Sequence, residues 1–378
     1  MKKYLAMILA AVCLFACIST TAFADDPIVI GILQDTTGGT ATLGKSVQKG
    51  VEDAIADINA AGGIGGKEVK FIEYDTAANV DTAIAAYIKA VTVDEVDFII
   101  APPIANIVNG LKAMTATFDV PMITLAVDPA CYKDENGNVY STLFCAQPST
   151  TVQGTIMAEF ALQNNFKNFG VFYTKDNSYS VALLNPFIDT VKANGGVLED
   201  ANIIGYNSTE TDISTLIKPL IDAGVDAIYC PNYTAPLVLI KKTCDQLGYT
   251  GAIITGLDGA PAFNTQVGAD CSNVYYINNI DVYEEATAKM IEERCSEVGA
   301  PNKYFLGYDS MQMAAKIMEE VGTDAAAVTE KLASYSYTGM TGVIAIDPET
   351  HMPVDGTPMF MYKYDNTTPV MLQKYPAD

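Results

Sequence analysis

The stretch GVEDAIADINAAGGIGGKEVKFIEYD (residues 50–75) carries two different patterns joined by a glycine-rich turn. Apolar residues recur at helical spacing over residues 47–59, and Gly62 and Gly63 end that pattern. The segment EVKFIEYD that follows is typical of a strand. A helix followed at once by a strand is the repeating part of a βαβ unit, so this stretch predicts a parallel sheet covered by helices.

The same alternation continues along the chain in two sets. Strands are predicted at 27–33, 68–75, 97–102 and 121–126 in the first set, and at 169–174, around Ile203, and at 226–231, 252–256 and 274–278 in the second. Two similar sets predict an α/β protein of two domains, each a doubly wound parallel sheet, with a ligand cleft beyond the carboxyl ends of the strands. Helical patterns return at 284–298, 308–321 and 325–333. The second domain is therefore expected to be inserted in the first, with several chain crossings forming a hinge.

The first 24 residues have the parts of an export signal. Lys2 and Lys3 give a charged start, an apolar run follows, and Ala-Phe-Ala at 22–24 is a cleavage site. No later segment approaches the roughly 20 apolar residues of a transmembrane helix. We therefore expect a signal peptide over 1–24 and an exported, periplasmic protein. In the alternative, Cys17 is lipidated and holds the protein on the outer side of the cell membrane.

The composition is strongly acidic, with 45 acidic against 22 basic residues and a net charge of −23. Such a surface repels nucleic acid, so no nucleic-acid partner is expected. Arg294 is the single arginine, which removes the side chain best suited to grip a phosphate. Both features weigh against a nucleotide ligand.

One short pattern nevertheless matches a phosphate-binding loop. Gly39, Gly44, Lys45 and Ser46 satisfy G-x-x-x-x-G-K-[ST]. In a true loop of this kind the first glycine directly ends a strand, whereas residues 34–38 intervene here. Export to a compartment without ATP also opposes this interpretation, and we take the match to be chance.

The sequence nominates no catalytic machinery. The one histidine, His351, stands in a polar turn and is expected at the surface, and there is no G-x-S-x-G elbow. The absence of a C-x-x-C pair argues against zinc. We expect no catalytic residue, no metal and no cofactor. An exported hydrolase with a carboxylate pair is the alternative, but no local arrangement nominates such a pair.

Cysteine usage predicts one disulfide bond. Six of the eight cysteines follow the leader, and an even count in an exported protein is typical of disulfides. Cys131 and Cys145 flank YKDENGNVYSTLF, a hairpin-like loop with a turn at 135–137, and are expected to pair. The other four have no assigned partners: Cys230, Cys244, Cys271 and Cys295.

Several segments together resemble the Leu/Ile/Val-binding family of substrate-binding proteins of ABC transporters. TGGTATLG (37–44) and INAAGGIGGK (58–67) match that family's opening, and the second is the most specific piece. Weaker matches follow in the right order: VPMITLAVDP (120–129), QPSTTVQG (147–154), DNSYS (176–180), TGLDG (255–259), LGYDS (306–310) and TGMTGVIAIDPET (338–350). The resemblance covers essentially the whole chain after the leader.

The resemblance implies a type I periplasmic binding fold, with two lobes joined by a three-crossing hinge. The N-terminal lobe would comprise 25–147 plus 281–357, and the C-terminal lobe 148–280 plus 358–378. It further implies a monomer that closes over an amino acid or a similar small solute and docks onto an ABC permease, with no chemistry on the ligand. In the alternative, the same fold presents a solute to a membrane receptor as a sensor.

The resemblance also implies ligand-binding residues. Asp258 matches the acidic residue that pairs with the ligand's α-ammonium, and Tyr179 a tyrosine that covers the ligand. Tyr233 or Thr234 would be a second such contact, and Leu43 falls where an aromatic often lines the side-chain pocket. The implied ligand-binding set is Ala105, Asn106, Ala126, Val127, Asp128, Tyr179, Tyr233 and Asp258.

Two of these positions depart from the family. Ala105 falls where a serine usually binds the ligand carboxylate, so backbone N–H groups of the helix starting near Asn106, or its side-chain amide, would have to replace it. Asp128 falls where threonine or serine is usual. Two carboxylates, Asp128 and Asp258, beside two tyrosines would favour a positively charged or donor-rich ligand. In the alternative, Asp128 only begins the turn at Pro129.

Overall fold

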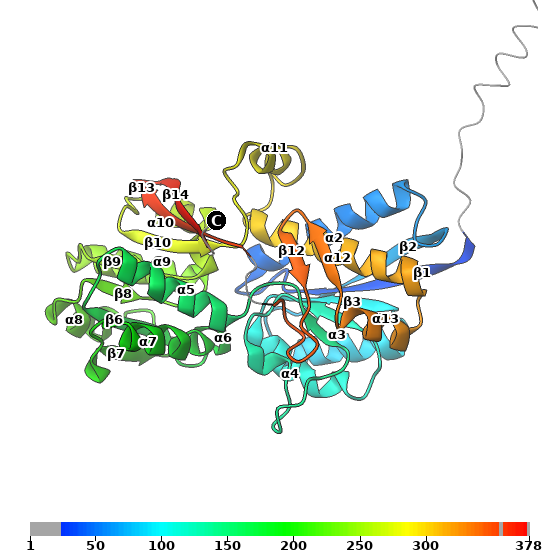
Figure 1. The fold of residues 1–378 in the computed structure, drawn as a ribbon, viewed down its shortest axis with the longest axis horizontal. Coiled ribbons are helices and arrows are strands. Elements are labelled where there is room, and N and C mark those ends of the chain that lie inside the picture. Colours follow the sequence, from blue (N-terminus) through cyan, green and yellow to red (C-terminus); the bar gives the residue numbers. More distant parts are fainter. Residues whose placement is uncertain (1–23, 355–357, 376–378) are drawn as a thin grey trace, which may run out of the picture.

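The computed structural model describes residues 24–354 and 358–375. Two α/β lobes lie side by side, as Figure 1 shows. The proposed signal peptide, apart from its last residue, and the alternative lipidation site at Cys17 lie outside the described residues.

The N-terminal lobe is built on a five-stranded parallel sheet in the order β2-β1-β3-β4-β5. Its strands are β1 (Ala24–Gln34), β2 (Lys67–Asp75), β3 (Phe98–Ala101), β4 (Met122–Thr124) and β5 (Leu143–Cys145). Its helices are α2 (Ala41–Ala60), α3 (Val80–Thr92), α4 (Ala105–Thr115), α12 (Pro301–Val321) and α13 (Ala325–Leu332), and a two-stranded hairpin, β11 (Ser336–Gly339) and β12 (Gly342–Ala345), packs beside them.

The C-terminal lobe has a seven-stranded sheet in the order β14-β13-β10-β9-β8-β6-β7. Its parallel strands are β6 (Phe169–Thr174), β7 (Ile203–Tyr206), β8 (Ala227–Tyr229), β9 (Ala252–Ile254) and β10 (Val274–Asn278). β13 (Met359–Asp365) and β14 (Thr368–Tyr375) extend it antiparallel. Its helices are α5 (Thr150–Gln163), α6 (Ser178–Ala182), α7 (Leu184–Ala193), α8 (Ser214–Asp222), α9 (Thr234–Gln246) and α10 (Pro261–Val267), and η3 (Leu257–Gly259) is a single 3-10 turn.

The chain crosses between the lobes after β5, after β10 and between β12 and β13, and α11 (Glu285–Arg294) projects near the second crossing (Figure 1). The predicted fold class, two doubly wound α/β lobes with a three-crossing hinge, is therefore confirmed. The antiparallel extension by β13 and β14 was not part of the sequence prediction. The exact lobe boundaries given above stay a prediction.

Two expectations from the sequence are wrong. His351 is not a surface residue: it is 5% exposed, its ring stacks on Phe144 with centroids 4.2 Å apart, and Nδ1 lies 3.1 Å from the carbonyl oxygens of Tyr140 and Leu143. Burial lowers the pKa of this imidazole. The helix expected at 308–321 begins at Pro301, because proline at the first helical position has a favourable φ and needs no N–H partner.

Helices α2 and α12 approach each other closely because each has a glycine at the contact, Gly50 in α2 and Gly307 in α12. A Cβ atom on Gly50 would lie 2.0 Å from the carbonyl oxygen of Tyr304, and one on Gly307 would lie 2.4 Å from that of Val47. Backbone atoms cannot move aside as a side-chain tip can. This pair of glycines therefore fixes α12, and with it the first turn of α12, against the N-terminal lobe.

We predict that Gly50→Ala lowers the free energy of unfolding by about 1–3 kcal/mol, because the added methyl group overpacks the α2–α12 contact. Urea denaturation followed by circular dichroism measures this change. Gly39→Ala is the matched control, since a Cβ there meets nothing within 4 Å, and it should change stability by less than about 0.5 kcal/mol. Equal effects of the two substitutions would contradict the close-packing argument.

Candidate functional site

The loop that matched a phosphate-binding pattern is occupied by the protein's own carboxylate. Asp35 accepts hydrogen bonds from the backbone N–H of Gly38 at 2.6 Å, the backbone N–H of Thr40 at 2.7 Å and the hydroxyl of Thr40 at 2.6 Å. A Cβ on Gly44 would lie 1.9 Å from the Asp35 carbonyl oxygen, so this glycine serves helix packing. The loop is therefore the start of α2, which agrees with the interpretation of the match as chance.

A cavity of about 500 Å³ lies between the two lobes. Its lining comes from strand ends and helix starts of both sheets, where a doubly wound fold is expected to bind ligands. The N-terminal lobe contributes Gly39, Thr40, Thr42, Leu43, Ala78, Ile104 and Asn106, and the C-terminal lobe contributes Thr174, Asp176, Asn177, Ser208, Tyr233, Thr234, Ala235, Pro236 and Gln266. The structure thus brings four residues named from the resemblance to one interlobe cavity: Leu43, Asn106, Tyr233 and Thr234.

Asn106 ties the two lobes together at the rim of this cavity. Its Nδ2 donates to the carbonyl oxygen of Asp176 at 3.1 Å, and its Oδ1 accepts from the backbone N–H of Ser178 at 2.8 Å. Both polar ends of the side chain are therefore used between lobes in this conformation. Asn106 acts here as a latch, and its amide is not free to replace the missing serine at position 105.

Tyr179 and Tyr233 form a stacked pair beside the cavity. Their ring centroids are 5.0 Å apart with an interplanar angle of 16°. The hydroxyl oxygens of both tyrosines, and Oε1 of Gln153, are buried without a hydrogen-bond partner in the part of the chain that the structure describes. Buried polar atoms are normally satisfied, so these atoms indicate a place where a polar solute could bind.

Asp258 lies in η3, directly after the close contact between Gly256 and Tyr179. A Cβ on Gly256 would lie 2.6 Å from the Tyr179 hydroxyl oxygen. The Asp258 side chain is 9% exposed and accepts a hydrogen bond from the hydroxyl of Thr234 at 3.2 Å. Burial raises the pKa of this carboxyl to about 6, although the charge of Lys303 acts in the opposite direction. A carboxylate so placed is suited to bind a positively charged group.

Sequence reasoning missed Lys303. It lies in the first turn of α12, is 6% exposed, and donates from Nζ to Oε1 of Gln147 at 3.3 Å. Burial lowers the pKa of this ammonium group to about 8, while the charge of Asp258 raises it. The signal that could have found it is Pro301, because a helix start at this proline places Lys303 at the hinge, among strand ends.

The segment after β4 is held by its own neighbours. Ala126 donates its N–H to Thr124 Oγ1 at 3.0 Å, and its carbonyl oxygen accepts from the hydroxyl of Tyr132. The carbonyl oxygen of Val127 accepts from the backbone N–H of Thr150 at 2.8 Å. The Ala126 backbone groups that the resemblance assigned to the ligand are thus engaged within the protein.

Asp128 takes the turn conformation given above as the alternative. Its Oδ1 accepts from the backbone N–H of Ala130 at 2.9 Å, and its Oδ2 lies 3.4 Å from Nδ2 of Asn109. It lines a second hollow, with Lys175 and Asp176 among the other lining residues, and not the 500 Å³ cavity. Burial, and with it the charge of Asp258, raises the pKa of both stacked tyrosines, and the charge of Asp128 adds to this effect at Tyr233.

The expected disulfide bond is absent: Cys131 and Cys145 are both free, buried thiols. Cys131 Sγ lies 3.6 Å from the carbonyl oxygen of Ala105, and Cys145 Sγ lies 3.4 Å from that of Ala126. Each thiol is thus directed at a different backbone carbonyl of the site region. The prediction of a pair rested on the even cysteine count and the hairpin, neither of which fixes the direction of a side chain.

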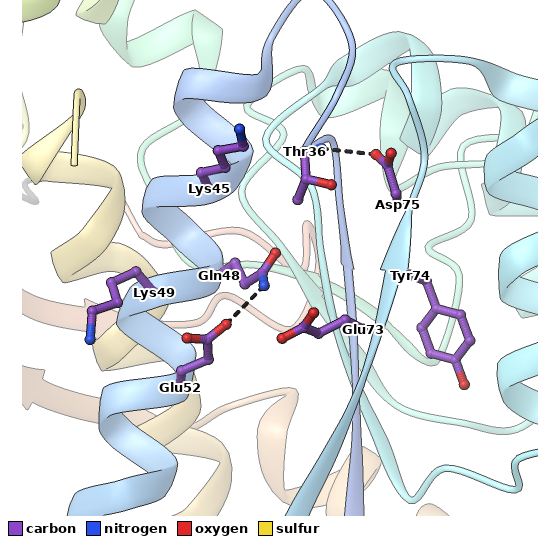
Figure 2. Close-up of a pocket in the computed structure, with 8 residues that line it drawn as sticks. All are labelled: Thr36, Lys45, Gln48, Lys49, Glu52, Glu73, Tyr74 and Asp75. Carbon is purple, nitrogen blue, oxygen red and sulfur yellow. Dashed lines mark hydrogen bonds between the residues drawn. The ribbon is translucent and has the colours of Figure 1, made fainter. Parts of the chain in front are cut away.

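A separate hollow of about 390 Å³ lies within the N-terminal lobe, between α2 and β2 (Figure 2). Figure 2 shows Glu52 and Glu73 directed toward each other there, with Lys45 higher on α2. The pKa of Glu52 is raised by burial and by the charge of Glu73. The residues that line this hollow all belong to the N-terminal lobe.

Comparisons with known proteins agree with the two-lobed fold described above. A family described as periplasmic binding protein matches residues 27–369. The Leu/Ile/Val-binding protein homolog 3 of Brucella melitensis is 26% identical over 335 residues, covering 83% of this chain and 84% of that protein. The chain therefore belongs to the leucine-binding, type I periplasmic binding protein family, whose members bind solutes.

Solved structures show the same fold. The branched-chain amino acid transporter substrate-binding protein LivJ of Streptococcus pneumoniae, in complex with isoleucine, has a TM-score of 0.79 at 21% identity, covering 92% of this chain and 99% of its own. A solute-binding protein of an ABC transporter from R. palustris, in complex with 4-hydroxybenzoate, has a TM-score of 0.81 at 16% identity, covering 93% and 97%. The fold thus accommodates both an amino acid and an aromatic acid.

Within residues 24–354 and 358–375, no three or more histidine, cysteine, aspartate or glutamate side chains gather to hold a metal ion. No helix in this part of the chain has the length and apolar character needed to span a membrane.

We predict that protein purified without reductant carries six protected thiols. A maleimide reagent should label none of Cys131, Cys145, Cys230, Cys244, Cys271 and Cys295 within minutes in the native state, because all six are buried, and should label all six after denaturation. Intact-mass spectrometry counts the labels. A tryptic peptide in which Cys131 is linked to Cys145 would contradict the structure.

Proposed function

We propose that this protein is the extracytoplasmic solute-binding protein of an ABC transporter. It captures an amino acid, branched-chain or related, between its two lobes and delivers it, as a monomer, to a membrane permease. It performs no chemistry on the solute. The names of its relatives and the family match over residues 27–369 support the assignment as a solute-binding protein. The residues of the candidate site support an amino acid as the solute.

The observation that carries the proposal is the buried carboxylate of Asp258, which accepts a hydrogen bond from the cavity-lining Thr234 and acts on the stacked pair of Tyr179 and Tyr233. A carboxylate that is 9% exposed needs a counter-charge or several donors. An α-ammonium group of a captured amino acid would supply both. Tyr179 and Tyr233 would separate to admit the solute and then cover it, with the Asn106 latch closing the lobes.

Lobe closure explains how binding would be reported to a permease. The bonds from Asn106 to the backbone of 176 and 178 exist only when the lobes are together. A solute that contacts both lobes stabilises the closed form by its differential affinity for it. The permease would then distinguish the loaded protein by the relative position of the two lobes.

We predict that Asp258→Asn weakens binding of the preferred amino acid at least about thirtyfold, because it removes the charge that pairs with the α-ammonium. Isothermal titration calorimetry after a thermal-shift screen of the twenty amino acids measures the loss. Asp226→Asn is the matched control: Asp226 accepts backbone hydrogen bonds from Lys167 and Asn168 at the amino ends of the strands. Undiminished affinity in Asp258→Asn would remove Asp258 from the site.

We further predict that amino-acid affinity falls by about tenfold between pH 7 and pH 5. The pKa of the Asp258 carboxyl is raised to about 6 in the folded protein, so the charged form is lost as pH falls through 6. The solute's own charges do not change over this range. Titrations at pH 5, 6 and 7 test the effect, and Asp258→Asn should show no such decline. A flat profile in the unsubstituted protein would oppose the assignment.

A further inference from the structure

Lys303 is an unusual side chain for the position it occupies. It follows Pro301 in the first turn of α12, and Tyr304, Phe305 and Leu306 after it are all buried. Burying an ammonium group carries a large desolvation cost unless acceptors surround it. A protein that needed only to fill this space would be served by a methionine or a leucine. A partner that offsets the desolvation of the Lys303 ammonium group is therefore expected.

The partners within the protein are too few. An ammonium group offers three donors, but among the described residues Nζ of Lys303 makes one hydrogen bond, to Gln147 Oε1 at 3.3 Å, and no ion pair. Asp258, in the other lobe, accepts a hydrogen bond from the hydroxyl of Thr234 at 3.2 Å, and the hydroxyl of Tyr179 also lowers the pKa of its carboxyl. The charges of Lys303 and Asp258 influence each other, and no ion pair joins them among the described residues. Lys303 is thus buried with donor capacity that its hydrogen bond to Gln147 does not use.

We propose that Lys303 is an anion-binding residue of the solute site, and that the preferred solute presents a carboxylate to Lys303 while its ammonium or donor end lies at Asp258. This inference rests on the proposed function and names the solute class more closely. It also accounts for Ala105: the carboxylate no longer needs a hydroxyl from that position, because a charged donor is supplied from the hinge side of the cleft.

The charge balance of the closed site selects among solutes. Asp258 and Lys303 carry opposite charges at neutral pH, and among the described residues the thiol of Cys145 also acts on the ammonium group of Lys303. A zwitterion leaves the closed site neutral and satisfies both side chains. A cationic amine would leave an unbalanced positive charge out of water, which is costly. With Lys303 in the site, a zwitterionic carboxylate is favoured over a ligand that carries positive charge alone.

The test compares carboxylates with their matched amides on the full chain after the leader. Thermal-shift and calorimetric titrations would use L-leucine with L-leucinamide, L-glutamate with L-glutamine, and 4-hydroxybenzoate with 4-hydroxybenzamide, beside the remaining amino acids. We expect the unsubstituted protein to prefer an α-carboxylate at least tenfold over its amide. Lys303→Met should weaken the preferred carboxylate at least tenfold and reduce the acid-over-amide ratio, whereas Lys303→Arg should keep most of both.

Lys241→Met is the matched control, because Lys241 is also buried but pairs with Asp245 on α9 at 2.5 Å. It should leave affinity within twofold. Each shift is measured against the same variant without solute, so a change in folding stability does not enter. The acid-over-amide ratio of the unsubstituted protein needs no variant, and it remains decisive if Lys303→Met does not fold.

The outcomes separate this inference from the proposed function. If amino acids bind but Lys303→Met retains full affinity, or amides bind as tightly as acids, solute binding stands and the role of Lys303 is overturned. If only a carboxylate without an amino group binds, and needs Lys303, the amino-acid proposal falls and Lys303 stands. If no carboxylate stabilises the protein, both are overturned.

Discussion

Parallel strands that end at a common edge impose the arrangement on which this molecule depends. In each lobe the chain leaves every parallel strand at the same side of the sheet, and the two sides face each other across the hinge. Residues as distant in sequence as Leu43, Asn106 and Tyr233 are therefore brought to one cleft. The cleft follows from topology, and the side chains decide only what it binds.

The two buried charges of Asp258 and Lys303 lie in different lobes and act on each other. A direct ion pair between Asp258 and Lys303 would satisfy both groups and close the space between them. Lys303 donates a hydrogen bond to Gln147, and Asp258 accepts one from Thr234. Each charged group is therefore oriented by a neutral side chain and could form further hydrogen bonds to a solute. The hydrogen bonds of Asn106 then hold the lobes at the distance that a small solute would bridge.

The sequence was sufficient for the architecture and only partly for the site. Strand and helix periodicity, with the glycine turn at 62–63, predicted two doubly wound lobes, because burial of apolar faces dictates both. Tyr179, Tyr233 and Asp258 were named as ligand contacts by resemblance; the structure stacks the two tyrosines and bonds Asp258 to Thr234, and the role of all three toward a ligand stays a prediction. The direction of a side chain was beyond reach: Asp128 caps a turn, His351 is stacked in the interior, and the thiols of Cys131 and Cys145 contact different carbonyls. Lys303 was missed because its helix was expected to begin at 308, past the proline that starts it.

The six buried thiols have a consequence for the life of the protein outside the cytoplasm. None of the described cysteines is cross-linked, and each lies within a packed interior. Maturation after export would then require no oxidant and no disulfide-forming enzyme, and no isomerase to correct wrong pairings. Such a chain could reach its native state as readily in an anoxic, reducing habitat as in an aerated one, at the price of depending on packing alone to protect its sulfur atoms.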